Sequence, residues 1–178
     1  AYYEDVDLGW RLWLAGHEVR HIPAAVVRHR GGGTAGRLPA DRRRCLHERN
    51  ALATVIKCYD DANLRRVLPA AVALAAVRAG ARPEVIETAS PPGRDGFPLP
   101  GASWPGWRAL EALELDLPAL ARSRRTVQAS RRRPDPAVLR LMVAPLAPVP
   151  PTPDMRAATE RAVERFELAS TFGRRAGA

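Results

Sequence analysis

Three carboxylates stand close together near the beginning of the sequence, at Glu4, Asp5 and Asp7. An ionised carboxylate can take the proton of a hydroxyl group, so one of these side chains could act as a general base. Acidic residues are also favoured in the first turn of a helix, because they interact with its partial positive charge and accept hydrogen bonds from unpaired N–H groups. The residue types are therefore compatible with catalysis and with helix capping.

A second chemical pattern reads His17-Glu18-Val19-Arg20-His21. On a helix, two histidines at this spacing bind zinc and the glutamate activates a water molecule. Gly16 precedes the pattern and Pro23 follows closely, which leaves too short a segment for that helix. In an extended strand the two histidines would lie about 13 Å apart and could not share a metal ion. A zinc metalloprotease therefore stays an alternative that the local sequence disfavours.

The basic side chains are nearly all arginine, and Lys57 is the only lysine. The formal net charge is +9, and the arginines form runs at residues 42–44, 124–125 and 131–133. Such a balance favours anionic partners, among them nucleotides, acidic lipids and nucleic acids. A nucleic-acid-binding protein is an alternative from a different class, but no aromatic residues interleave with these runs and no zinc-finger or RNA-binding spacing is present. We expect no nucleic-acid partner, whereas association with an acidic membrane surface stays open.

The elements that must position these side chains are predicted to be mostly helical. Apolar periodicity predicts helices over residues 5–15, 42–59, 63–79, 107–115 and 117–128, and a last one from Pro153 with Thr152 as its N-cap. Pro118 is expected to interrupt the helical region in which it lies. Two β-prone runs, residues 18–22 and 25–29, should form two short strands or one broken strand. The expected fold class is mostly α with two short strands and Pro-rich flexible segments.

Proline-rich and glycine-rich stretches divide the chain. Residues 83–106 have the composition of a linker, and residues 134–153 form a second such run. The predicted organisation is a first unit at residues 1–82, the linker, and a helical, partly disordered extension at residues 107–178.

The sequence also favours a cytoplasmic location. Cys45 and Cys58 are too few and too far apart for a disulfide framework or a zinc pair. Residues 1–7 lack the basic and apolar regions of a signal peptide. The most apolar window, residues 67–77, is much shorter than the about 20 residues that a membrane span needs. The inner face of the cell membrane remains an expected place of action.

Three consecutive segments together resemble the family 2 glycosyltransferases, in particular the rhamnosyl- and galactofuranosyl-transferase-like members. These segments are residues 3–11 with the acidic pair, Gly16-His17, and the Ile22-Pro23-Ala24 run that leads to His29. Residues 48–52, Glu-Arg-Asn-Ala-Leu, are similar to the segment that follows in such enzymes. The resemblance covers about residues 1–60 and implies the C-terminal part of an α/β fold of the GT-A type.

The resemblance implies an inverting transfer of a sugar from a nucleotide-sugar donor to a hydroxyl of a glycan or lipid-linked acceptor, as in the synthesis of cell-envelope polysaccharides. Asp5 matches the general base of the family, and Glu4 matches the acid that contacts acceptor hydroxyls. His29 matches a histidine that binds a divalent metal in several members. Such an ion, Mg²⁺ or Mn²⁺, would stabilise the departing diphosphate.

Family 2 enzymes also carry a parallel sheet, a nucleotide pocket and an Asp-x-Asp metal motif before this region. The run Asp5-Val6-Asp7 has the letters of that motif, but it falls within the acidic-pair segment and is not interpreted as the metal site. The Gln-x-x-Arg-Trp motif of processive members is absent from the sequence. We therefore expect a partial transferase that is inactive without an N-terminal nucleotide-binding half.

Overall fold

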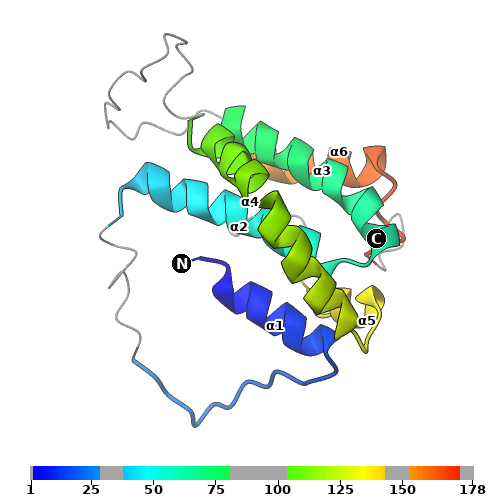
Figure 1. Ribbon diagram of the computed structural model, residues 1–178. Coiled ribbons are helices and arrows are strands. Elements are labelled where there is room, and N and C mark those ends of the chain that lie inside the picture. Colours follow the sequence, from blue (N-terminus) through cyan, green and yellow to red (C-terminus); the bar gives the residue numbers. More distant parts are fainter. Residues whose placement is uncertain (1, 29–37, 81–103, 143–152, 173–178) are drawn as a thin grey trace.

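The structure is a computed structural model in which residues 2–28, 38–80, 104–142 and 153–172 are described. These residues form six helices, and Figure 1 shows how they gather into one assembly. The helices are α1 (Glu4–Leu14), α2 (Ala40–Cys58), α3 (Asp61–Gly80), α4 (Trp104–Ala129), α5 (Asp135–Leu139) and α6 (Pro153–Arg165). The expectation of a mostly helical chain is confirmed.

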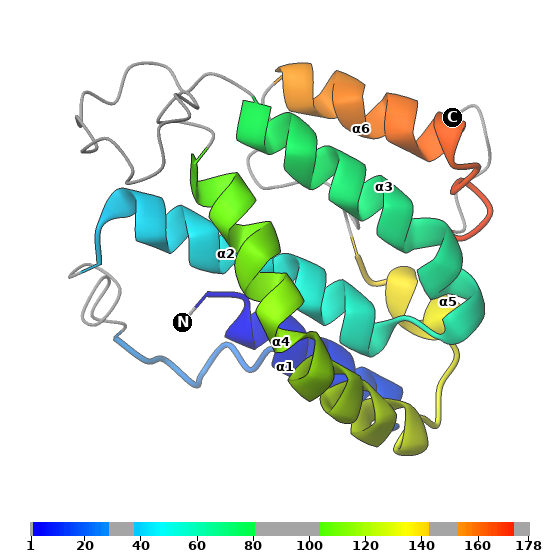
Figure 2. The same cartoon turned by 45° about the horizontal axis from the view of Figure 1, so that its top comes forward.

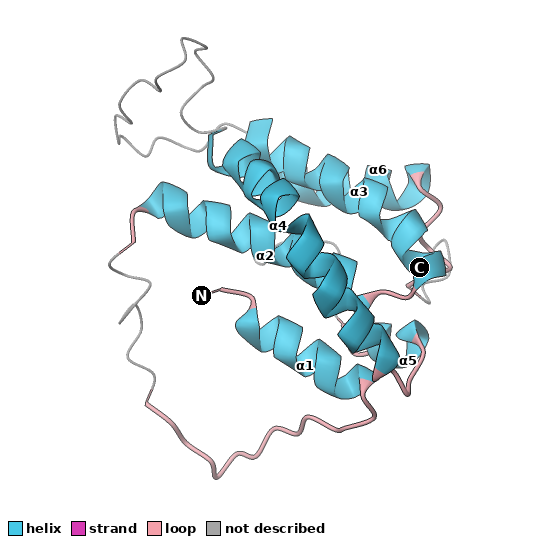
Figure 3. Ribbon diagram, in the orientation of Figure 1, coloured by secondary structure: helices cyan, strands magenta, loops and turns pink. Residues whose placement is uncertain are grey.

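The two predicted strands are wrong, because no strand occurs among the described residues. From His17 to Arg28 the chain runs as a loop, which Figure 3 shows in pink beside α1. A strand is stabilised by hydrogen bonds to a neighbouring strand, and the described parts of the chain supply none. The apolar residues of this segment are accordingly exposed, with Val26 at 82% and Val27 at 85% of their full accessibility.

Helix α2 is the central element of the assembly. Helices α1, α3 and α4 all pack against it, and α6 lies along the far side of α3, as Figure 2 shows. The main core takes residues from all six helices and the turn after α2, with Trp10, Leu14, Cys58, Tyr59, Val67, Leu74, Val127, Leu139, Met155 and Ala162 among its members. A second cluster joins Leu52, Ala71, Ala75, Leu113 and Leu120. Residues from both sides of the predicted linker at 83–106 therefore share one hydrophobic core.

Helix α4 continues through Pro118, so the predicted interruption is wrong. Proline cannot donate the backbone hydrogen bond to the carbonyl four residues earlier, which here belongs to Glu114. Both Pro118 and Glu114 are exposed, so water can replace the missing donor. Burial of Leu113 and Leu120 against α2 and α3 holds the two halves of the helix in line. Among the described helices, none is long and apolar enough to cross a membrane.

Arginines of the C-terminal half bind the end of α2. Arg124 donates to the carbonyl of Tyr59 at 2.7 Å, and Arg131 donates to the carbonyl of Cys58. Gln128, one helical turn after Arg124, donates to the carbonyl of Lys57 at 2.8 Å. These donors satisfy carbonyls that have no partner within α2 and place positive charge at its negative end. Arg44 of the first run likewise donates to the carbonyl of Arg78 at 2.6 Å, so all three arginine runs contribute side chains to intramolecular contacts.

Helix α1 ends in a turn that requires glycine. Gly16 has a φ of 94°, its N–H donates to the carbonyl of Trp13 at 3.1 Å, and the N–H of His17 donates to the carbonyl of Leu12 at 2.9 Å. This is the Schellman arrangement, in which a left-handed residue closes the helix. A Cβ atom at residue 16 would also lie 3.3 Å from the Cδ atom of Arg132.

We expect Gly16→Ala to lower the free energy of unfolding by about 1–2 kcal/mol, because alanine disfavours the left-handed conformation. Gly9 provides the matched control, since it lies inside α1, where an added Cβ atom would meet no neighbouring group within 4 Å. Gly9→Ala should raise the free energy of unfolding by about 0.5–1 kcal/mol. Urea denaturation of the two variants measures both changes, and equal shifts in the same direction would refute the assigned turn.

Candidate functional site

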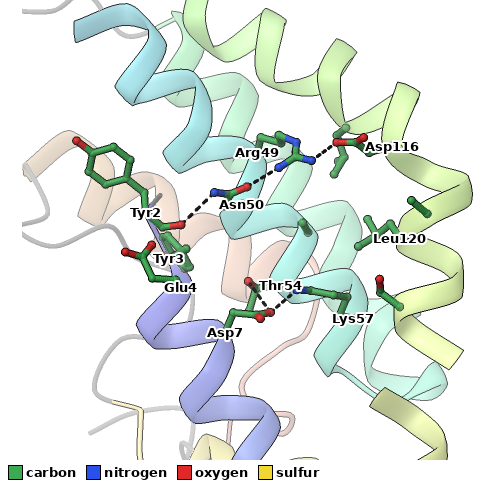
Figure 4. A pocket seen from close by; sticks show the side chains of 14 residues that line it. Tyr2, Tyr3, Glu4, Asp7, Arg49, Asn50, Thr54, Lys57, Asp116 and Leu120 are labelled. Atoms are coloured by element: carbon green, nitrogen blue, oxygen red, sulfur yellow. Dashed lines mark hydrogen bonds and ion pairs between the residues drawn. The ribbon is translucent and has the colours of Figure 1, made fainter. Parts of the chain in front are cut away.

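A polar pocket of about 320 Å³ opens between the first turn of α1, the middle of α2 and the middle of α4. Figure 4 shows side chains of all three helices pointing into it. Its lining consists of Tyr2, Tyr3, Glu4, Asp7, Arg49, Asn50, Ala53, Thr54, Lys57, Leu113, Asp116, Ala119, Leu120 and Ser123.

An ion pair between α1 and α2 forms the floor of the pocket. The ammonium of Lys57 lies 2.5 Å from Oδ1 of Asp7, and both side chains are largely buried. Thr54 donates its hydroxyl to the same carboxylate oxygen at 3.4 Å, and Arg11 donates to the other oxygen at 2.8 Å. Asp7 is therefore a structural anchor that holds α1 against α2.

A second ion pair joins α2 to α4 across the pocket. Arg49 pairs with Asp116, and its other terminal nitrogen donates to Oδ1 of Asn50 at 2.7 Å. Asn50 in turn donates to the backbone carbonyl of Tyr2 at 3.0 Å. This chain of contacts runs from α4 through α2 to the residues that precede α1, as the dashed lines in Figure 4 show.

Two tyrosines form the rim beside α1. Tyr2 and Tyr3 have φ values of 67° and 66°, a conformation that bulky residues rarely adopt and that costs on the order of 1–3 kcal/mol each. The ring of His47 packs edge-on against Tyr3, with ring centroids 4.9 Å apart. Burial raises the pKa of Tyr3, so its hydroxyl stays protonated at neutral pH and can donate a hydrogen bond.

The predicted site residues fall in different places. Glu4 lines the pocket. Asp5 also lies in the first turn of α1, but it is exposed and is not part of the lining; its Oδ1 accepts the N–H of Val6 at 2.8 Å. His29 lies outside the described residues. Residues 17–21, the metalloprotease pattern, are not helical, and the histidines and glutamate among them are exposed.

Residues 48–52, the second part of the resemblance, divide between the core and the pocket. Glu48 is buried and accepts three hydrogen bonds from Arg78 of α3, at 2.7, 2.8 and 2.9 Å. Leu52 belongs to the cluster shared with α4. Arg49 and Asn50 face the pocket. This segment therefore attaches α2 to its neighbours and also supplies polar groups to the site.

Lys57, Thr54 and Asp116 were not predicted as site residues. Asn50, Thr54 and Lys57 follow one another at helical spacing on one face of α2, which is a pattern that the sequence contains. No sequence pattern links Asp116 to these residues, because only the packing of α4 against α2 brings it close to them. In the described parts of the chain, no group of three or more His, Cys, Asp and Glu side chains is placed to hold a metal ion.

Comparison with known proteins returns no match for this chain, whether among family models, curated proteins or solved structures.

Proposed function

We propose that this chain is the acceptor-side catalytic part of an inverting family 2 glycosyltransferase. The observation that carries the proposal is that residues 3–11 and 48–52, two segments of the resemblance more than thirty residues apart, lie at α1 and in α2, which pack against each other. Asn50 binds the carbonyl of Tyr2, and Lys57 pairs with Asp7. The segments meet around one polar pocket that Glu4 lines, with Asp5 beside it in the same helical turn.

In this mechanism Asp5 takes the proton of the acceptor hydroxyl. Its carboxylate is exposed and makes no ion pair with any described residue, so an incoming hydroxyl can reach it. The acceptor oxygen forms a bond to the anomeric carbon of the donor as the bond to the nucleoside diphosphate breaks. Glu4, adjacent in sequence, accepts hydrogen bonds from other acceptor hydroxyls. A divalent ion bound to the donor would neutralise charge on the departing diphosphate.

Donor binding requires structure that the described residues lack. They contain no parallel sheet, and their glycines form no phosphate-binding loop at a helix N-terminus. The 178-residue chain alone should therefore bind an acceptor without transferring a sugar to it, because a base cannot act on a donor that is not positioned. On this proposal, the nucleotide-binding part belongs to a further segment of the polypeptide or to another chain.

The proposal is tested with the complete polypeptide that the gene encodes and, in parallel, with the 178-residue chain. Both are incubated with uridine, guanosine and thymidine diphosphate sugars, Mg²⁺ or Mn²⁺, and membrane or glycan acceptors from the source cell. We expect the complete polypeptide to release a nucleoside diphosphate only when metal and acceptor are present, and the short chain to release none. Release that is independent of any acceptor hydroxyl, or no release with any donor, would refute the proposal.

A further inference from the structure

The charges that line the pocket between α1, α2 and α4 nearly cancel. The lining contains three carboxylates, Glu4, Asp7 and Asp116, and two cations, Arg49 and Lys57. Both cations are already in ion pairs, Arg49 with Asp116 and Lys57 with Asp7. Three negative groups and two positive groups leave one formal negative charge, which belongs to Glu4.

This balance disfavours phosphates and nucleotides. A diphosphate would bring negative charge beside Glu4, and the lining has no cation that is not already paired with a carboxylate. To bind a phosphate, Lys57 would have to give up its pairing with the largely buried Asp7, which would then keep its ion pair with Arg11, so this exchange weakens the interactions of a largely buried carboxylate. The chain's excess of arginine therefore does not make this pocket an anion site.

The same lining suits a ligand that carries many hydroxyl groups. The carboxylate of Glu4 accepts hydrogen bonds, the ammonium of Lys57 has two N–H groups besides the one that its pairing with Asp7 occupies, and the hydroxyl of Ser123 can both donate and accept. Each hydroxyl of a sugar both donates and accepts, so one ring can satisfy donors and acceptors that face it from different helices. Leu113 and Leu120 add apolar surface for the C–H groups of such a ring.

We propose that this pocket binds an uncharged saccharide and that the side chains of α4 determine which saccharide it accepts. The volume of about 320 Å³ lies at the small end of the roughly 300–1,000 Å³ typical of ligand sites, which fits one or two sugar rings. Helix α4 contributes Asp116, Ala119, Leu120 and Ser123, none of which belongs to the glycosyltransferase resemblance. The role of the saccharide as acceptor rests on the proposed function; its binding does not.

Ligand-observed NMR on the 178-residue chain tests the proposal. The probes are methyl glycosides of neutral hexoses and deoxyhexoses, with uridine diphosphate and inorganic phosphate as anionic comparisons. We expect saturable binding of at least one neutral glycoside and no binding of either anion at the same concentration. Absence of saccharide binding, or binding of the diphosphate in its place, would overturn the assignment.

Two tryptophan substitutions on α4 locate the binding. Ala119 is exposed and lines the pocket, whereas Ala121 is exposed on the same helix outside the lining. Ala119→Trp should fill the pocket and weaken saccharide binding by about tenfold or more, or about 1.4 kcal/mol. Ala121→Trp should leave the dissociation constant unchanged. Circular dichroism confirms the helical content of both, and an equal effect of the two substitutions would place the saccharide elsewhere.

The outcomes separate the pocket from the proposed activity. If the complete polypeptide transfers sugar while the short chain binds no saccharide and Ala119→Trp does not alter transfer, the pocket assignment fails and the transferase stands. If the short chain binds a saccharide, Ala119→Trp weakens that binding, and no donor is ever consumed, the pocket assignment is supported and the proposed transferase activity is refuted.

Discussion

Replacement of Asp5 by asparagine is expected to lower kcat for glycosyl transfer by the complete polypeptide by about 10²–10⁴-fold, the usual contribution of a general base. Asparagine keeps the size of the side chain and can still accept the N–H of Val6, a hydrogen bond of 2.8 Å that helps to begin α1. It cannot take a proton from an acceptor hydroxyl. The loss should therefore appear in kcat, with the helical content and the melting temperature of the protein unchanged.

Two further variants serve as controls for the expected loss of kcat. Asp154→Asn changes an exposed acid in the first turn of α6, and it should leave transfer unaltered. Glu4→Gln removes an acceptor contact but not the base, so it should raise KM for the acceptor more than it lowers kcat. A kcat of Asp5→Asn within a few-fold of the parent would remove Asp5 from the mechanism.

Loss of Asp135 is expected to produce the largest change in stability. This carboxylate has no solvent exposure, yet it accepts hydrogen bonds from Arg131 at 2.7 Å, Asn63 at 2.9 Å and the backbone N–H of Asp60 at 3.0 Å. It connects the start of α5 to the turn between α2 and α3. Asp135→Ala leaves the mostly buried Arg131 without its carboxylate, which typically costs about 3–5 kcal/mol.

Denaturant unfolding, followed by circular dichroism, measures this cost. Asp154→Ala is the matched control, because it removes an aspartate from the first turn of a helix at an exposed position. Its effect should stay within about 1 kcal/mol. If Asp135→Ala unfolds at the same denaturant concentration as the control, the hydrogen bonds around Asp135 do not stabilise the fold.

Most helices were predictable because each has its own local pattern, but α5 lies within the run 134–153 that was predicted as proline-rich and not as helical. Apolar spacing located α1, α2 and α3, and Gly16 marked the end of the first through its left-handed conformation. The two strands failed for the opposite reason, since β-prone residues such as Val26 and Val27 form a strand only when another segment pairs with them. The predicted interruption at Pro118 was wrong for a similar reason. Packing of Leu113 and Leu120 against α2 and α3 outweighs the tendency of proline to end a helix.

The candidate site was predictable only where its residues are neighbours in the sequence. Glu4 was selected through the acidic pair and lines the pocket. Lys57 and Asp116 come from segments far from that pair, and their ion pairs with Asp7 and Arg49 depend on how α1, α2 and α4 pack. Local sequence patterns carry no information about such long-range pairing, so the polar lining required the fold.

The most direct test of the central claim is the anomeric configuration of the transferred sugar, read from proton NMR of the first product of the complete polypeptide. A single base that activates the acceptor for one direct displacement must invert the configuration of the donor. The mechanism assigned to Asp5 therefore predicts an inverted linkage. A product that retains the configuration of the donor would contradict it.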